Sequence, residues 1–225
     1  MQQRAFLFDL NGTMIDDMSY HIRAWHRIFN ELGAPLSLEQ AKLECYGKNH
    51  EVLERVFPGR FKDEEKDKMS IDKEKQYQLE YAPEMKLIDG LQEFLDTAYK
   101  NGIKMAIGSA AIMFNIDFVL EGLNIRHYFD SIVSADDVAI SKPHPETYLR
   151  CAEQLNVSPE NCIVFEDSPK GVEAAARAGM QAVVLTTMHD AEDFKGLDNI
   201  LFIVTDYTDP AIAQLSPIKK EIAVK

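Results

Sequence analysis

From residue 90 onward, short apolar runs alternate with segments in which apolar residues recur every three or four positions. The short runs have the length of buried strands, and the other segments have the spacing of amphipathic helices. The predicted elements are strands at 103–108, 131–134, 162–165, 181–185 and 201–204 and helices at 90–101, 112–123, 146–155 and 170–178. Strands that alternate with helices form a parallel sheet with helices on both faces. The sequence therefore predicts an α/β fold with a Rossmann-like parallel sheet.

One further apolar run, at residues 4–10, precedes this alternation and ends in the turn sequence NGT. Between this run and the alternating part, residues 18–57 and 62–81 show helical spacing. A lone buried strand needs a sheet to pair with, so residues 4–10 must join the later sheet and the helical block must be an insertion. The predicted division is a Rossmann-like core domain at residues 1–14 and 86–225 with an inserted all-helical cap domain at residues 15–85.

The charge balance restricts the partners of the chain. It has 24 lysines and arginines against 37 aspartates and glutamates among 225 residues, a formal net charge of −13. This charge repels nucleic acid and anionic lipid, so neither a nucleic acid nor a membrane is expected as a partner. No apolar run approaches the roughly 20 residues of a membrane span, and the segment from Met1 to Phe8 lacks a signal-peptide pattern. We expect a cytoplasmic protein; the sequence does not specify an oligomeric state, and a monomer is compatible with it.

Polar residues gather where the predicted strands end. In an open parallel sheet, ligands bind beyond the carboxyl ends of the strands. The polar segments at these ends are residues 9–13, Ser109, Lys142, which stands a few residues beyond its strand, and Glu166-Asp167. This edge of the sheet is therefore the predicted ligand site.

The residue types at this edge suit a metal ion and a phosphate group. Asp9 and Glu166-Asp167 end two apolar strands, and carboxylates that converge there repel one another unless a hard cation such as Mg²⁺ holds them. Ser109 and Lys142 supply a hydroxyl donor and a point charge that suit phosphate oxygens. Taken singly, each of these residues is more often a helix cap, a turn residue or a surface charge. Their joint order along the chain favours the functional interpretation.

Five segments of the chain carry a recognisable pattern: FLFDLNGTMIDD, YHIRAW, IGSA, SKPHPETYL and FEDSPKGVEAAARAGM. In these segments, over roughly the first 190 residues, the chain resembles the haloacid dehalogenase-like hydrolase superfamily. Within the superfamily it is similar to the beta-phosphoglucomutase-like branch, which carries a helical cap. The resemblance implies a Mg²⁺-dependent phosphatase or phosphoglucomutase-like enzyme that acts on a small phosphorylated metabolite such as a sugar phosphate.

The resemblance also implies a role for each residue of the site. Asp9 would be the nucleophile that becomes an aspartyl phosphate. Mg²⁺ would lie between the Asp9 carboxylate, the backbone carbonyl of Asn11 and Asp167, with Glu166 as a nearby or water-mediated ligand. The phosphoryl oxygens would be held by Thr13, Ser109 and Lys142.

Two residues of the cap are candidates for substrate binding. The resemblance places His21 beside the acid/base residue, and Lys48 falls near the position of a basic residue that binds a distal phosphate. The alternatives are a helix-surface histidine and an exposed turn lysine. Lys73 and Lys75 are candidates for the same anion, but their charge-rich helix favours solvated side chains.

Asn11 is the main departure from the family pattern, which has an aspartate there as the general acid and base. An amide can neither donate a proton to the leaving group nor accept one from water. The resemblance therefore predicts a site that binds Mg²⁺ and phosphate but transfers the phosphoryl group poorly. Asn11 is either an engineered substitution or the residue of a natural lineage. The sequence leaves two alternative functions open: a non-catalytic or low-activity phospho-ligand binding protein, and a phosphonate-cleaving hydrolase that uses a cap lysine, for which Lys48 is poorly placed.

Overall fold

The structure is a computed structural model that describes residues 4–215. Its centre is a sheet of six parallel strands in the order β3-β2-β1-β4-β5-β6. The strands are β1 (Ala5–Phe8), β2 (Lys104–Gly108), β3 (Ser131–Val133), β4 (Cys162–Glu166), β5 (Gln181–Leu185) and β6 (Ile200–Val204). The predicted α/β fold with a parallel sheet is confirmed, and the isolated first strand lies in the middle of the sheet, between β2 and β4.

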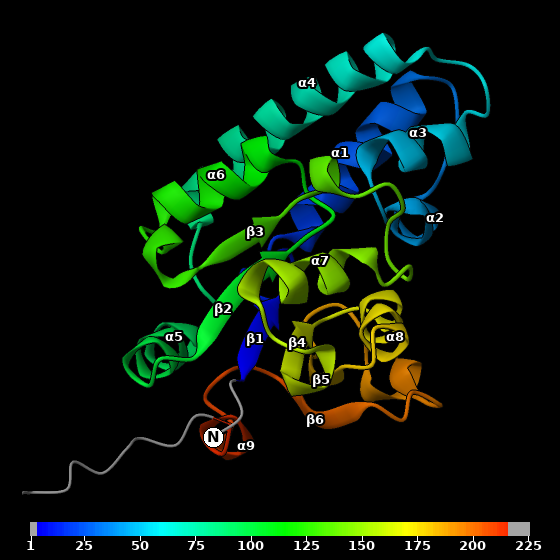
Figure 1. The fold of residues 1–225 in the computed structure, drawn as a ribbon. Helices are drawn as coiled ribbons and strands as arrows, with labels where there is room; N and C mark the ends of the chain where they lie inside the picture. The colour runs from blue at the N-terminus through cyan, green and yellow to red at the C-terminus, as the bar shows by residue number, and fades with distance from the viewer. Residues whose placement is uncertain (1–3, 216–225) are drawn as a thin grey trace, which may run out of the picture.

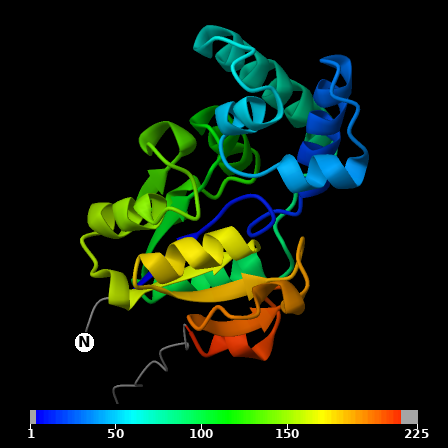
Figure 2. The same cartoon turned by 90° about the vertical axis from the view of Figure 1, so that its right-hand side faces the viewer.

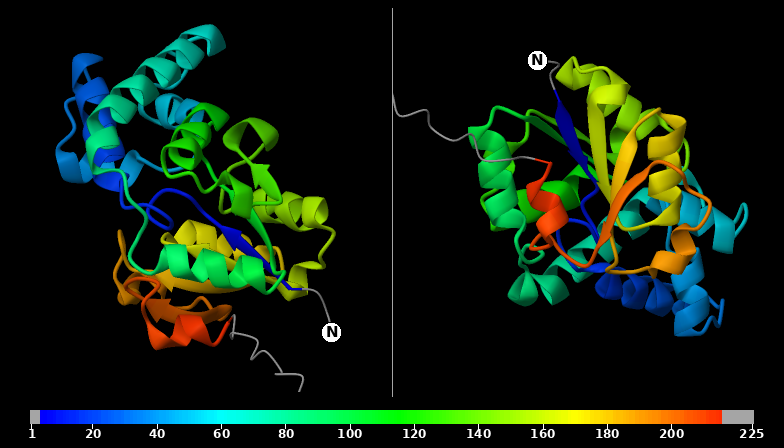
Figure 3. Two further views of the ribbon diagram at one scale, coloured as in Figure 1. Left: turned by 90° about the vertical axis from the view of Figure 1, so that its left-hand side faces the viewer. Right: turned by 90° about the horizontal axis from the view of Figure 1, so that it is seen from below.

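Helices cover both faces of the sheet (Figure 3). One face carries α5 (Leu91–Lys100), α6 (Met113–Gly122) and α9 (Pro210–Ala213), and the other carries α7 (Glu146–Leu155) and α8 (Pro169–Arg177). Short 3₁₀ helices lie at Arg126–Tyr128 (η2), Ala135–Asp137 (η3), Pro159–Asn161 (η4) and Ala191–Phe194 (η5).

The alternation of side chains along β1 explains the two layers. Phe6 and Phe8 belong to one apolar cluster, and Ala5 and Leu7 belong to the other. All four residues are fully buried. A strand covered on both faces has this nearly continuous apolar sequence.

The segment between β1 and β2 is helical, as predicted. It comprises α1 (Met18–Glu31), α2 (Leu38–Glu44), α3 (Asn49–Val56), α4 (Asp63–Tyr81) and the 3₁₀ helix η1 (Ala82–Glu84). These helices lie together on one side of the sheet (Figures 1 and 2) and bury an apolar cluster of their own, which includes Trp25, Phe29 and Leu53. The domain boundaries at residues 15 and 85 stay a prediction. Among residues 4–215, no helix is both long and apolar enough to cross a membrane.

Helix α4 differs from the expectation of solvated lysines. Lys75 is exposed, but Lys73 is only 4% exposed and Glu74 only 3%. The Lys73 ammonium lies 2.8 Å from a Glu74 carboxylate oxygen. The interpretation of Lys73 as a solvated side chain is therefore wrong. The sequence did not reveal its burial, because a helix face that buries paired charges shows no apolar periodicity.

Candidate active site

The topology brings the predicted polar residues to one place. Asp9 follows β1, Glu166 ends β4 and Asp167 comes next, while β1 and β4 are neighbours in the sheet. One carboxylate oxygen from each of the three residues lies within 4.8 Å of the other two, and all three residues are buried. The sequence prediction that these carboxylates converge is therefore realised in the structure.

Lys142 contacts two of these three carboxylates. Its ammonium donates to Asp9 Oδ1 at 2.6 Å, to Glu166 Oε1 at 2.8 Å and to the carbonyl oxygen of Gly108 at 2.9 Å. Its side chain is only 8% exposed. One lysine faces three carboxylates, so the cluster keeps a net negative charge when all of them are ionised.

The protonation of the carboxyl groups reflects this crowding. Burial raises the pKa of Asp9 to about 7, with Lys142 opposing the shift and Glu166 adding to it. Burial also raises the pKa of Asp167 well above its usual value, and the charges of Glu166 and Asp9 raise it further. Burial acts the same way on Glu166, but Lys142 and hydrogen bonds outweigh it and lower the pKa of that group. A cation would relieve the repulsion that remains.

The donor set fits Mg²⁺. All available ligand atoms are oxygens, which this hard cation prefers. Gly12 keeps the turn close to the site: it has φ +76°, and a Cβ there would lie 2.2 Å from Asp167 Oδ2. Glu166 is held firmly, since its Oε2 accepts from the Asp167 nitrogen and from both the nitrogen and the hydroxyl of Ser168, each at 3.0 Å.

The hydroxyl groups of Ser109 and Thr13, both expected to hold phosphoryl oxygens, occupy different positions. Ser109 lines the cavity described below, and its Oγ accepts from the backbone nitrogen of Ala111 at 3.1 Å. Thr13 is fully buried, and its hydroxyl donates to Asp167 Oδ1 at 3.3 Å. Ser109 can therefore reach a ligand directly, whereas Thr13 contacts the carboxylate cluster.

A cavity of about 380 Å³ separates the sheet edge from the helical block. One wall carries Asp9, Asn11, Ser109, Lys142, Glu166 and Asp167. The opposite wall comes from α1 to α4 and includes His21, Trp25, Lys73 and Glu74. The cavity has the size of a small-molecule site.

Position 11 is tied to the helical block. Asn11 Nδ2 donates to Asp17 Oδ2 at 2.6 Å and lies 3.2 Å from His21 Nε2. His21 is 8% exposed, so it is a buried cavity residue rather than a helix-surface one. In contrast, the Lys48 ammonium donates to the carbonyl of Val138, and Lys48 is not among the described residues that line the cavity.

Sequence reasoning missed three polar residues near the cavity, Asp17, Glu74 and Tyr77, and set a fourth, Lys73, aside as solvated. All four are at most 4% exposed. Helical spacing carried a weak signal, because Asp17 and His21, like Lys73 and Tyr77, stand four residues apart and share a helix face. Such pairs are common on solvated helices, so the spacing alone does not identify a buried network.

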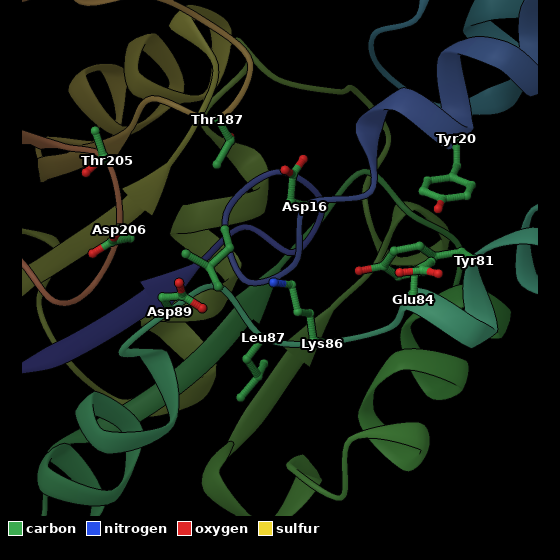
Figure 4. Close-up of a pocket in the computed structure, with 11 residues that line it drawn as sticks. Asp16, Tyr20, Tyr81, Glu84, Lys86, Leu87, Asp89, Thr187, Thr205 and Asp206 are labelled. Atoms are coloured by element: carbon green, nitrogen blue, oxygen red, sulfur yellow. The ribbon is translucent and has the colours of Figure 1, made fainter.

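A second pocket, of about 360 Å³, lies where the helical block joins the core (Figure 4). Tyr20 and Tyr81 pack edge to face there, with ring centroids 5.1 Å apart. Its carboxylates come from Asp16, Glu84, Asp89 and Asp206. Among residues 4–215, one lysine, Lys86, faces these four carboxylates, whereas the cavity beside Asp9 is lined by Lys42, Lys73, Lys142 and Lys170. The cavity beside Asp9 is therefore the better candidate for a phosphorylated ligand.

The haloacid dehalogenase-like hydrolase family matches residues 6–185 of the chain. The validoxylamine A 7'-phosphate phosphatase of Streptomyces hygroscopicus subsp. limoneus is 31% identical, over 93% of this chain and 98% of that protein. The beta-phosphoglucomutase of Bacillus subtilis is also 31% identical, over 80% of this chain and 82% of that protein.

A solved structure supports the same assignment. The beta-phosphoglucomutase of Clostridium difficile has a TM-score of 0.81 and 29% identity, covering 96% of this chain and 97% of that one. The family match includes Asp9, Asn11, Ser109, Lys142, Glu166 and Asp167. The chain therefore belongs to the haloacid dehalogenase-like hydrolase family, in its beta-phosphoglucomutase-like branch, and is an enzyme of the phosphatase and phosphoglucomutase type.

Proposed function

We infer that the protein is a Mg²⁺-dependent phosphoryl-transfer enzyme that acts on a small phosphorylated metabolite of the sugar phosphate class. The observation that carries this inference is the convergence of Asp9, Glu166 and Asp167 around Lys142 at the carboxyl end of the sheet. The relatives named as a phosphatase and as beta-phosphoglucomutase support the same reaction class.

Asp9 would act as the nucleophile. One of its carboxylate oxygens attacks phosphorus, the bond from phosphorus to the leaving oxygen breaks, and an aspartyl phosphate forms. Water then attacks this phosphorus and the Asp9 carboxylate leaves. The contact of Asp9 with Lys142 supports this role, because the ammonium favours the ionised, nucleophilic form.

The metal ion would be held by the Asp9 carboxylate, the backbone carbonyl of Asn11 and the Asp167 carboxylate, with Glu166 beside it. When bound, Mg²⁺ would neutralise charge on the phosphate oxygens. All three N–H groups of the Lys142 ammonium donate to protein oxygens, so Lys142 would exchange one of these contacts, such as that with Asp9, for a phosphoryl oxygen. Ser109 would supply a hydroxyl donor from the next strand end, and Thr13 would complete the set around the phosphoryl group.

Phosphate release from a panel of sugar monophosphates in the presence of Mg²⁺ tests this function. We expect turnover by the wild-type chain and none by Asp9→Asn, which removes the nucleophile but keeps the side-chain volume. Asn11 favours one second candidate, a protein that binds phospho-ligands without turnover. Binding of substrate by both chains, with neither phosphate release nor isomerisation of the sugar phosphate by either, would establish that candidate instead. The cytoplasmic location stays a prediction from the sequence.

A further inference from the structure

A proton must reach the leaving group when a sugar phosphate is cleaved, because an alkoxide is a poor leaving group. The Asn11 carboxamide has no acidic proton to give. It lines the cavity together with Asp9, so the reaction needs a donor close to position 11. The further inference concerns that donor, and it rests on the proposed function.

His21 is the cavity residue with a titratable atom next to position 11. Its Nε2 lies 3.2 Å from Asn11 Nδ2 and 3.2 Å from Asp17 Oδ2. Asp17 is fully buried and does not line the cavity, whereas His21 does. His21 Nε2 therefore lies one hydrogen-bond length from both the Asn11 side chain and the Asp17 carboxylate, on a residue that belongs to the cavity wall.

The partner of His21 Nδ1 determines which nitrogen of the neutral imidazole carries the hydrogen. Lys73 Nζ lies 2.7 Å from His21 Nδ1. An ammonium only donates, so Nδ1 accepts and the hydrogen of the neutral ring must be on Nε2. The Lys73 ammonium also donates to Glu74 at 2.8 Å, and Glu74 accepts from Asn49 at 2.8 Å and from Asn115 at 2.5 Å. Burial alone would raise the pKa of Glu74, but the Lys73 charge and the hydrogen bonds from Lys73 and Asn49 lower it, which favours the Glu74 carboxylate.

The ring is also fixed in orientation. Tyr77 stacks on His21, with ring centroids 4.0 Å apart and an angle of 16° between the planes. The Tyr77 hydroxyl donates to Asp17 Oδ2, the same oxygen that accepts from Asn11 and faces His21 Nε2. Asp17 Oδ1 has no hydrogen-bond partner among the described residues. Asp17 Oδ2 is thus an acceptor shared by the His21 ring and the Asn11 amide, and it orients both groups.

We propose that His21 transfers the proton in this enzyme, with Asp17 and Lys73 as positioning residues. As the phosphorus–oxygen bond breaks, the leaving oxygen takes the Nε2 proton and Nδ1 takes one from the Lys73 ammonium, which becomes an amine. When water attacks the aspartyl phosphate, its proton goes to Nε2 and Nδ1 returns a proton to Lys73. Asp9 is regenerated, and every proton is accounted for.

The dependence on the leaving group separates proton transfer from a structural role. A sugar phosphate accepted by the wild type needs a proton on its leaving oxygen, whereas p-nitrophenyl phosphate releases a stable phenolate that needs none. We expect His21→Gln to lower kcat for the sugar phosphate by roughly 10²–10⁴-fold and to change kcat for p-nitrophenyl phosphate less than about tenfold. His26→Gln, at a histidine on the same helix outside the cavity lining, should leave both rates unchanged.

Equal losses of His21→Gln on both substrates would overturn the proposal. A wild-type chain inactive on both substrates, or an Asp9→Asn variant that keeps activity, would instead contradict the proposed function. If His21→Gln unfolds below the assay temperature, Asp17→Asn takes its place, because it keeps the side-chain volume and withdraws the charge that aligns His21. The same split between the two substrates, at a smaller size, is expected for Asp17→Asn, and its absence would overturn the proposal.

Discussion

The meaning of Asn11 depends on the side chain beside it. From the sequence alone, an amide at position 11 predicts a missing acid, so Asn11→Asp should raise kcat. The structure adds Asp17, whose carboxylate oxygen lies 2.6 Å from Asn11 Nδ2. A second carboxylate at this distance in a buried site would share one proton with Asp17 rather than act as an independent acid.

This contact gives a prediction for two variants. Asn11→Asp alone should lower kcat on a sugar phosphate or leave it flat. The double variant Asn11→Asp, Asp17→Asn keeps one carboxylate and one amide in contact, so it should exceed Asn11→Asp by at least roughly tenfold. Steady-state kinetics of the two variants on one substrate checks this. A gain of 10²–10⁴-fold from Asn11→Asp alone would show that Asp17 does not control this position.

At the residue scale, the sequence identified the carboxylates that the structure brings together, while their roles stay a prediction. Asp9, Glu166 and Asp167 were identifiable because a carboxylate directly after an apolar strand is conspicuous. The cap half was identified only in part: His21 was a candidate, but the burial of Lys73 and Glu74 was not predicted, since they lie in a helix whose charges give no periodic signal. Their burial depends on pairing across helices that only the tertiary structure brings together.

At the scale of elements, the approach of α8 to the end of β4 positions Glu166. Gly171 lies in the first turns of α8, and a Cβ there would be 1.7 Å from Glu166 Oε1. The helix can therefore begin against this carboxylate only because residue 171 has no side chain. The Ser168 cap at the start of α8 donates to the same glutamate at 3.0 Å.

We expect Gly171→Ala to displace Glu166, break its contact with Lys142 and destabilise the fold by about 1–3 kcal/mol through overpacking. Turnover should fall with it, because Lys142 loses one of the groups that hold it. Urea unfolding and kcat on one substrate measure both effects. Glu173→Ala, a surface position on the same helix, is the matched control and should stay within about 0.5 kcal/mol. A Gly171→Ala chain as stable and active as the control would refute this account of α8.

The predicted strands and the helices predicted from residue 90 to 178 agree with the structure to within a few residues. The stretch predicted as helical at 18–57 divides into α1, α2 and α3, and α9 was not predicted. Strand positions were predictable because both faces of the sheet are covered, which leaves continuous apolar runs. The order of the strands required the structure, since no periodicity states which strand pairs with which. The central position of β1 follows from the pairing with both β2 and β4.

At the scale of the whole molecule, a cation should stabilise the fold. Three buried carboxylates share one lysine, and burial raises the pKa values of Asp9 and Asp167. Mg²⁺ at about 100 times its dissociation constant should add about 2.7 kcal/mol to the free energy of unfolding and raise Tm. Thermal unfolding in EDTA and in Mg²⁺ measures the shift.

Asp167→Asn is the matched variant for this measurement. It replaces a buried carboxyl group, whose ionisation is disfavoured by burial and by Glu166 and Asp9, with a neutral amide. Its Tm in EDTA should therefore exceed that of the wild type, while its gain from Mg²⁺ should be largely lost. A wild-type Tm that does not respond to Mg²⁺, or an undiminished response in Asp167→Asn, would remove this cluster as the metal site.

The covalent phosphoryl group on Asp9 is the central claim of the account, and mass spectrometry tests it most directly. The wild-type chain is mixed with a sugar phosphate that it turns over, in Mg²⁺, and quenched in acid within one turnover. The account predicts a mass gain of one phosphoryl group on the peptide that contains Asp9, and no such gain in Asp9→Asn. Turnover without this adduct at any quench time, together with an active Asp9→Asn variant, would contradict it.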